Sequence, residues 1–183
     1  MIGPRLRVFF TLTLLLAGCR GGAKGATTAP APGETAAPPD ADAVRAVDFN
    51  QLATFQTLLR QTGGQLEPRA IVYADVTGDG REEAIVPVTS GGTLGNLAYQ
   101  VYTLRGGVAA PILTATRDAG TAGGVVLSVE DGKLIRTTGK YGPADPRCCP
   151  SVLVKTYYRW DGVNLQVGRE EELPASPSQK TKD

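Results

Sequence analysis

Residues 152–169 read VLVKTYYRWDGVNLQVGR, and this stretch decides the fold. Apolar and polar side chains alternate from Val152 to Trp160 and again from Leu165 to Arg169, as they do in strands with one buried face. Asp161-Gly162 stands between the runs and indicates a hairpin, because a type I′ turn needs positive φ at both central residues. One face of the first strand is expected to be core and carries Val152, Val154, Thr156, Tyr158 and Trp160. The opposite face carries Leu153, Lys155, Tyr157 and Arg159.

The same pattern recurs three times upstream. The paired runs are 70–74 and 83–88 around an Asp/Gly-rich loop, 99–104 and 108–115 around Gly106-Gly107, and 125–129 and 133–138 around Asp131-Gly132. Consecutive hairpins of this kind build an antiparallel meander. We therefore expect a meander of about six to eight strands.

One helix is expected before the strands. Asp48, followed three residues later by Gln51, resembles a capping box, and apolar residues recur at helical spacing from Leu52 to Leu59. Gly63-Gly64 ends the helix because glycine accepts the left-handed conformation found after helix C-termini. One N-terminal helix followed by an antiparallel β-meander predicts an α+β fold. We place this single domain at residues 48–173.

The segments on either side of that domain lack bulky apolar residues. Residues 20–47 are rich in Ala, Pro, Gly and Thr, and such a composition cannot bury enough surface to offset its ordering entropy. We expect a disordered linker over residues 19–47 and a disordered tail over residues 174–183.

The N-terminus has the composition of a secretory signal peptide over residues 1–18. Arg5 and Arg7 precede the apolar run Val8 to Leu16, which is far shorter than the roughly 20 residues of a transmembrane helix. Leu16-Ala17-Gly18-Cys19 then resembles the lipobox of bacterial lipoproteins. The resemblance implies a diacylglyceryl thioether on Cys19, a membrane anchor outside the cytoplasm and, because Arg20 is not Asp, the outer membrane where two membranes exist. The alternative is an ordinary signal peptide with a chance cysteine.

The composition of the chain narrows the classes of function. Its 19 basic and 18 acidic side chains nearly balance, so no electrostatic footprint for nucleic acid is present. Histidine is absent, which removes the commonest general base and the usual metal ligand. We therefore predict a non-catalytic protein, while an enzyme that uses Lys, Asp or Glu as its base stays open.

Residues 75–83, DVTGDGREE, form the candidate metal site. Calcium takes six to eight oxygen ligands, and Asp/Gly loops supply them from alternate residues. The candidate ligands are Asp75, Thr77, Asp79, the backbone carbonyl of Arg81 and Glu83. The stretch is similar to the calcium loops of FG-GAP and integrin-type repeats. It differs from an EF-hand in two positions. Thr77 replaces an Asp or Asn, and Val86 stands where an EF-hand needs its bidentate Glu. The alternative is a plain β-turn whose aspartates accept hydrogen bonds from their own backbone.

Cys148 and Cys149 are the only cysteines besides Cys19. Disulfides persist outside the cytoplasm, so we predict a vicinal disulfide between the two. Adjacent Cα atoms lie about 3.8 Å apart, below the usual disulfide range, so this bridge would be strained. It would serve as a loop staple or, alternatively, as the redox centre of an extracytoplasmic thiol-redox protein, although the C-x-x-C spacing is missing.

These observations predict a membrane-anchored lipoprotein that faces the periplasm or the exterior. Its domain is expected to be a non-catalytic binding or envelope-structural module, with one calcium ion as a candidate stabiliser. The expected partners are the membrane, through the lipid anchor, and an envelope protein or small ligand that the sequence does not identify.

Overall fold

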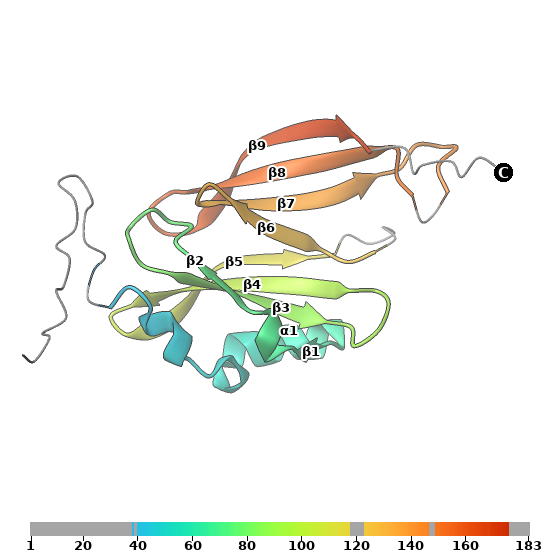
Figure 1. The fold of residues 1–183 in the computed structure, drawn as a ribbon. Helices are drawn as coiled ribbons and strands as arrows, with labels where there is room; N and C mark the ends of the chain where they lie inside the picture. The colour runs from blue at the N-terminus through green and yellow to red at the C-terminus, as the bar shows by residue number, and fades with distance from the viewer. Residues whose placement is uncertain (1–37, 39, 118–122, 147–148, 176–183) are drawn as a thin grey trace, which may run out of the picture. The chain divides into compact units, whose positions relative to one another are not determined.

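The computed structural model describes residues 38, 40–117, 123–146 and 149–175. The lipobox with Cys19, most of the expected linker, Cys148 and residues 176–183 lie outside this part of the chain. Within it, the chain forms two antiparallel sheets, which we call sheet A and sheet B (Figure 1).

Sheet A is built on three consecutive strands, β3 (Glu83–Thr89), β4 (Asn96–Arg105) and β5 (Val108–Thr116). Two short strands, β1 (Gln65–Leu66) and β2 (Val72–Ala74), pair with the two ends of β3. Sheet B is a four-stranded meander of β6 (Val126–Glu130), β7 (Lys133–Lys140), β8 (Val152–Trp160) and β9 (Leu165–Pro174).

All but one of the helical elements precede the strands, the exception lying between β1 and β2, and they differ in detail from the expected single helix. They are the 3-10 turns η1 (Ala43–Ala46), η2 (Phe49–Gln51) and η3 (Pro68–Ala70) and the helix α1 (Ala53–Thr62). Asp48 caps η2 by accepting a hydrogen bond from the backbone N–H of Asn50 at 3.0 Å, so the capping residue opens a 3-10 turn and not the α-helix. Gly63, with φ of 67°, ends α1 where the sequence indicated.

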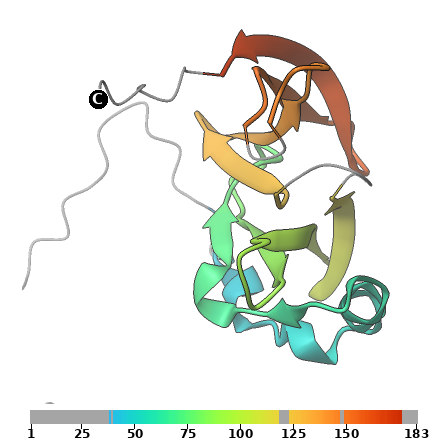
Figure 2. The same ribbon diagram turned by 90° about the vertical axis from the view of Figure 1, so that its right-hand side faces the viewer.

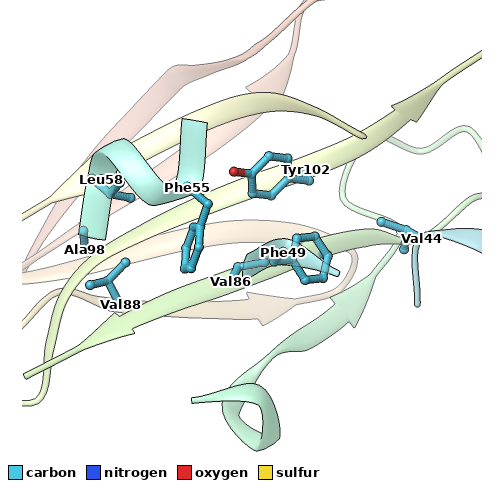
Figure 3. Close-up of a cluster of buried hydrophobic side chains, with 9 residues drawn as sticks. Val44, Phe49, Phe55, Leu58, Val86, Val88, Ala98 and Tyr102 are labelled. Carbon is cyan, nitrogen blue, oxygen red and sulfur yellow. The ribbon is translucent and has the colours of Figure 1, made fainter. Parts of the chain in front are cut away.

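Sheet A is buried on both faces. Ala84, Val86 and Val88 of β3 face α1 and the 3-10 turns, and they pack with Phe49, Phe55, Leu58 and Tyr102 in a first hydrophobic cluster (Figure 3). Figure 2 shows α1 beside sheet A on this side. Ile85 points the other way, into a second cluster that joins the sheets and includes Val101, Ile112, Leu134 and Leu165. A central strand covered on both faces reads as a continuous apolar run, and β3 carries one from Ala84 to Val88.

The expected α+β class is wrong. Strands hold 48% of the described residues and helical turns 15%, so the domain is mainly β. The helix α1 has 10 residues and shares the cover of sheet A with η1 and η2. Hairpin patterns are local and do not tell whether β5 pairs with β6. In the structure these two strands belong to different sheets, and the meander divides between them.

The hairpin of β8 and β9 extends beyond the run that the sequence indicated, from Arg169 to Pro174. Alternation fails here because polar cross-strand contacts hold the pair. The hydroxyl of Thr156 donates to Glu170 at 3.0 Å and that of Tyr157 to Glu171 at 3.1 Å. On the expected core face of β8, only Thr156 is buried; Tyr158 and Trp160 pack against the second cluster, and Val152 and Val154 are half-buried.

Candidate functional site

Glu83, the last residue of the Asp/Gly loop (residues 75–83), is fully buried at the start of β3. Its Oε2 accepts hydrogen bonds from the backbone N–H of Val76 at 3.0 Å and of Thr77 at 3.2 Å. Its Oε1 accepts from the hydroxyls of Thr103 at 3.0 Å and Thr77 at 3.4 Å. Burial raises the pKa of Glu83, while the donors of Val76 and Thr103 act in the opposite direction. Glu83 therefore fastens the loop to strands β3 and β4.

The two aspartates of the loop also bind its own backbone. Asp75 accepts hydrogen bonds from the N–H of Gly78 at 2.6 Å and of Gly80 at 2.9 Å, one at each carboxylate oxygen. Asp79 accepts from the N–H of Arg81 at 2.9 Å. Gly78 and Gly80 have φ of 79° and 83°, which side chains rarely adopt, so glycine is required at both positions. These contacts are the ones that the β-turn alternative predicts.

The Asp/Gly loop also holds the entry of the chain into the domain. Arg81 lies 3.2 Å from Asp40, measured between Nε and Oδ1, and the N–H of Glu82 donates to the carbonyl of Ala41 at 2.7 Å. Arg45 pairs with Glu82 at 2.6 Å. The expected linker boundary at residue 47 therefore moves to about residue 40, because Val44 in η1 is only 1% exposed and belongs to the first cluster.

The candidate calcium ligands do not converge on one point. No group of three or more His, Cys, Asp or Glu side chains that could hold a metal occurs within the described part of the chain. Asp75 and Glu83 turn their oxygens to N–H and hydroxyl donors, and Arg81 contributes its side chain to Asp40. The hydrogen bonds are those of the β-turn alternative, and calcium binding stays a prediction from the sequence.

A pocket of about 500 Å³ opens beside the loop, and we call it the inter-sheet pocket. It is lined by residues 75–78 of the loop, residues 131–133 at the β6–β7 turn and residues 158–160 at the end of β8. The turn contacts the loop closely, since a Cβ at Gly132 would lie 3.6 Å from the carbonyl oxygen of Asp75. Asp131 and Gly132 have φ of 50° and 70°, the positive values of a type I′ turn.

The sequence pointed to each wall of this pocket separately. The Asp/Gly loop, the Asp131-Gly132 turn and the aromatic end of β8 each follow from local patterns. Their proximity depends on how sheet B packs on sheet A, and no local pattern specifies that. The pocket itself was therefore missed.

The cysteine loop lies between β7 and β8. Its base is closed by Asp145, which accepts hydrogen bonds from the backbone N–H of Gly142 at 2.7 Å and of Ser151 at 2.8 Å. These donors hold the pKa of Asp145 below its ordinary value. Cys149 takes part in a disulfide. Cys148 lies outside the described residues, so the vicinal pairing stays a prediction.

Within the described residues, no helix is long and apolar enough to cross a membrane. No family model, no curated protein and no solved structure matches the chain.

Proposed function

We propose that this chain is a bacterial lipoprotein, anchored by acyl chains on Cys19 and facing away from the cytoplasm. The observation that carries the proposal is Leu16-Ala17-Gly18-Cys19 directly after the apolar run Val8 to Leu16. Each buried methylene contributes about 0.8 kcal/mol, and two or more acyl chains hold a protein stably at a membrane. Arg20 favours the outer membrane where the cell has two.

The folded domain is, in this proposal, a binding module without catalytic activity. The chain has no histidine. The most deeply buried carboxylate among the described residues, that of Glu83, has its oxygens occupied by backbone and hydroxyl donors, which is the arrangement of a structural group. The volume of the inter-sheet pocket, about 500 Å³, lies within the range of about 300–1,000 Å³ that is typical of ligand sites.

The anchor is tested by labelling cells with an alkyne fatty acid and separating membranes from soluble fractions. The natural chain is expected in the membrane fraction with label attached. Cys19→Ala is expected to carry no label and to leave the membrane or stall unprocessed. The matched control replaces both Cys148 and Cys149 by Ala, which removes thiols from the domain but leaves the lipobox intact, and it should label normally. Labelled, membrane-bound Cys19→Ala protein would overturn the proposal.

A further inference from the structure

We infer that the domain docks on the membrane surface that holds Cys19, and that it does so through an apolar patch on two hairpin tips. We call this the tip patch, and it consists of Val108 and Val163 with Arg105, which adjoins both. The inference rests on the anchor proposed above and adds which face of the domain meets the lipid. The surface that fits is one of zwitterionic phospholipid headgroups.

The tip patch lies where the β4–β5 and β8–β9 hairpins meet. Val108 is 68% exposed and Val163 is 56% exposed. Val108 is the cross-strand partner of Arg105, and the guanidinium of Arg105 donates to the carbonyl of Val163. Both valines therefore adjoin one side chain, which makes them neighbours and not apolar residues scattered singly over the surface.

The chain enters the domain at the same end. Asp40 lies 3.2 Å from Arg81, which holds the first residues of the domain on the Asp/Gly loop. That loop lines the inter-sheet pocket together with Trp160, and the guanidinium of Arg105 lies over the ring of Trp160. Figure 1 shows the β2–β3 loop and the β4–β5 and β8–β9 turns at one end of the two sheets.

The tether keeps this end near the membrane. Twenty residues lie between Cys19 and Asp40. A flexible linker of that length, which the composition predicts, has a root-mean-square reach of about 25 Å. Short flexible tethers give effective concentrations in the millimolar range, so a contact with a dissociation constant of about 1 mM is formed about half of the time. Removing two valine side chains from water supplies a weak contact of this kind.

The charges at this end select the headgroup. Arg81 faces two carboxylates, that of Asp40 at 3.2 Å and that of Asp79 at 3.8 Å. Asp161, in the β8–β9 turn, brings a further negative charge beside the positive charge of Arg105. An anionic surface therefore gains no net attraction here. Zwitterionic headgroups carry both signs and meet this mixed surface without repulsion.

The opposite end of the domain supplies a matched comparison. Leu94, in the loop between β3 and β4, is 48% exposed. It lies at the other end of β4 from Arg105, and the 10 residues of that strand span about 33 Å. A domain that docks through the tip patch therefore holds Leu94 away from the lipid.

Trp160 reports the docking, because it is the only tryptophan of the chain and lies beside Arg105 of the tip patch. The lipidated full-length protein is reconstituted into phosphatidylcholine vesicles, with and without a lipid that carries a nitroxide quencher on its headgroup. Docking for about half of the time predicts that the nitroxide lowers the emission by up to about half. Replacing part of the phosphatidylcholine by phosphatidylglycerol should not increase this loss.

Three variants assign the docking to the tip patch. Val108→Asp and Val163→Asp each place a charge on the patch and should reduce the loss of emission at least about twofold, because a charge is costly to remove from water. Val163→Ser removes the apolar surface without adding a charge and should act in the same direction. Leu94→Asp is the matched control and should be quenched like the natural chain. Thermal melts show which variants are folded.

The inference is overturned if the nitroxide quenches the natural chain and the tip variants equally, or if Leu94→Asp reduces the loss as they do. Self-association that the tip variants abolish, with no difference in quenching, would assign the patch to a second copy and also overturn it. Flotation with the vesicles separates the two proposals. A chain that floats without tip-dependent quenching removes the docking and leaves the anchor, whereas a chain that does not float removes both.

Discussion

The buried carboxylate of Glu83 accepts a hydrogen bond from the backbone N–H of Val76 at 3.0 Å. The same oxygen accepts from the N–H of Thr77, so one side chain at the start of β3 satisfies two adjacent donors of the Asp/Gly loop. Buried N–H groups without a partner are costly. The contact therefore explains why a charged residue occupies a position with no exposure to solvent.

Replacing Glu83 distinguishes its hydrogen bonds from its charge. Glu83→Gln can turn its amide oxygen to the two N–H groups and its NH₂ group to the hydroxyls of Thr103 and Thr77, which can accept as well as donate. Glu83→Leu leaves both N–H groups without a partner, at about 1–3 kcal/mol each. Urea unfolding should therefore show a small change for Gln and a large loss for Leu. Equal losses in the two variants would contradict this account.

The pH dependence of stability gives a second, independent measurement on Glu83. Burial raises the pKa of Glu83 in the folded state, so its contribution to stability is present below the unfolded pKa and is lost as pH rises through the folded one. Other carboxylates, such as those of Glu82 and Asp161, whose pKa values are lowered, act with the opposite sign. The quantity to measure is therefore the unfolding free energy of the natural chain minus that of Glu83→Gln. We expect this difference to decrease as the pH is raised from about 4 to about 7. A constant or increasing difference would contradict the raised pKa.

Calcium is expected to leave the melting temperature unchanged, because Asp75 and Glu83 turn to donors of the protein itself. A ligand present at tenfold its dissociation constant would stabilise the fold by about 1.4 kcal/mol and raise the melting temperature by a few degrees. Melts in millimolar calcium and in chelator should coincide. Asp75→Ala should be less stable in both conditions, since Gly78 and Gly80 lose their acceptor. A calcium-dependent shift that this variant abolishes would restore the metal site.

The new domain boundary predicts how truncations behave. A chain lacking residues 1–39 keeps Val44 in the core and the contacts of Ala41 and Arg45 with Glu82, so its stability should match that of the mature protein. A chain lacking residues 1–47 loses all three, and burial of the valine alone contributes about 1.5–3 kcal/mol. Urea unfolding of the two truncations should differ clearly. Equal stability of the two truncations would contradict the new boundary and would support a domain that begins at residue 48.

The sequence predicted the hairpins well because their information is local. Asp131-Gly132 lies between β6 and β7 with positive φ at both residues, as a type I′ turn requires. Asp161-Gly162 also lies between strands, but only Gly162 has a positive φ and the connection runs over residues 161–164, so the type I′ turn expected there is wrong. The burial of Val44 could not be predicted in the same way, since Val44 and Val47 are the only valines of an Ala/Pro/Gly-rich stretch and two residues do not establish a periodic pattern. Its position follows from the ion pairs and backbone contact that bring residues 40–46 onto the Asp/Gly loop.

The candidate site shows a similar division between local and long-range information. The spacing of Asp75, Asp79 and Glu83 is compatible with a calcium loop and with a β-turn. In the structure Glu83 also has a donor from β4, the hydroxyl of Thr103, which is distant in sequence and which the spacing could not indicate. The inter-sheet pocket depends on Trp160 and Asp131 meeting across the boundary between sheets, which is again a long-range property.

The last prediction concerns the loop between β7 and β8, where Asp145 and the cysteines act on the same segment. Asp145 joins both ends of the loop by accepting from Gly142 and Ser151, independently of the disulfide of Cys149. Reduction alone should therefore leave the loop closed and the melting temperature nearly unchanged. When the disulfide is reduced in the Asp145→Ala variant, the loop should open. Limited proteolysis should then cut that variant within residues 142–151.

Mass spectrometry under denaturing conditions checks the pairing itself. The non-reduced monomer should weigh about 2 Da less than the reduced one, because one disulfide removes two hydrogens. Two titratable thiols would contradict the vicinal bridge, and a disulfide-linked dimer would make the loop an assembly contact. The reduction potential tests the thiol-redox alternative. A value below roughly −300 mV would contradict the redox role, whereas a value of about −120 to −270 mV is expected both of a thiol oxidoreductase and of a strained staple.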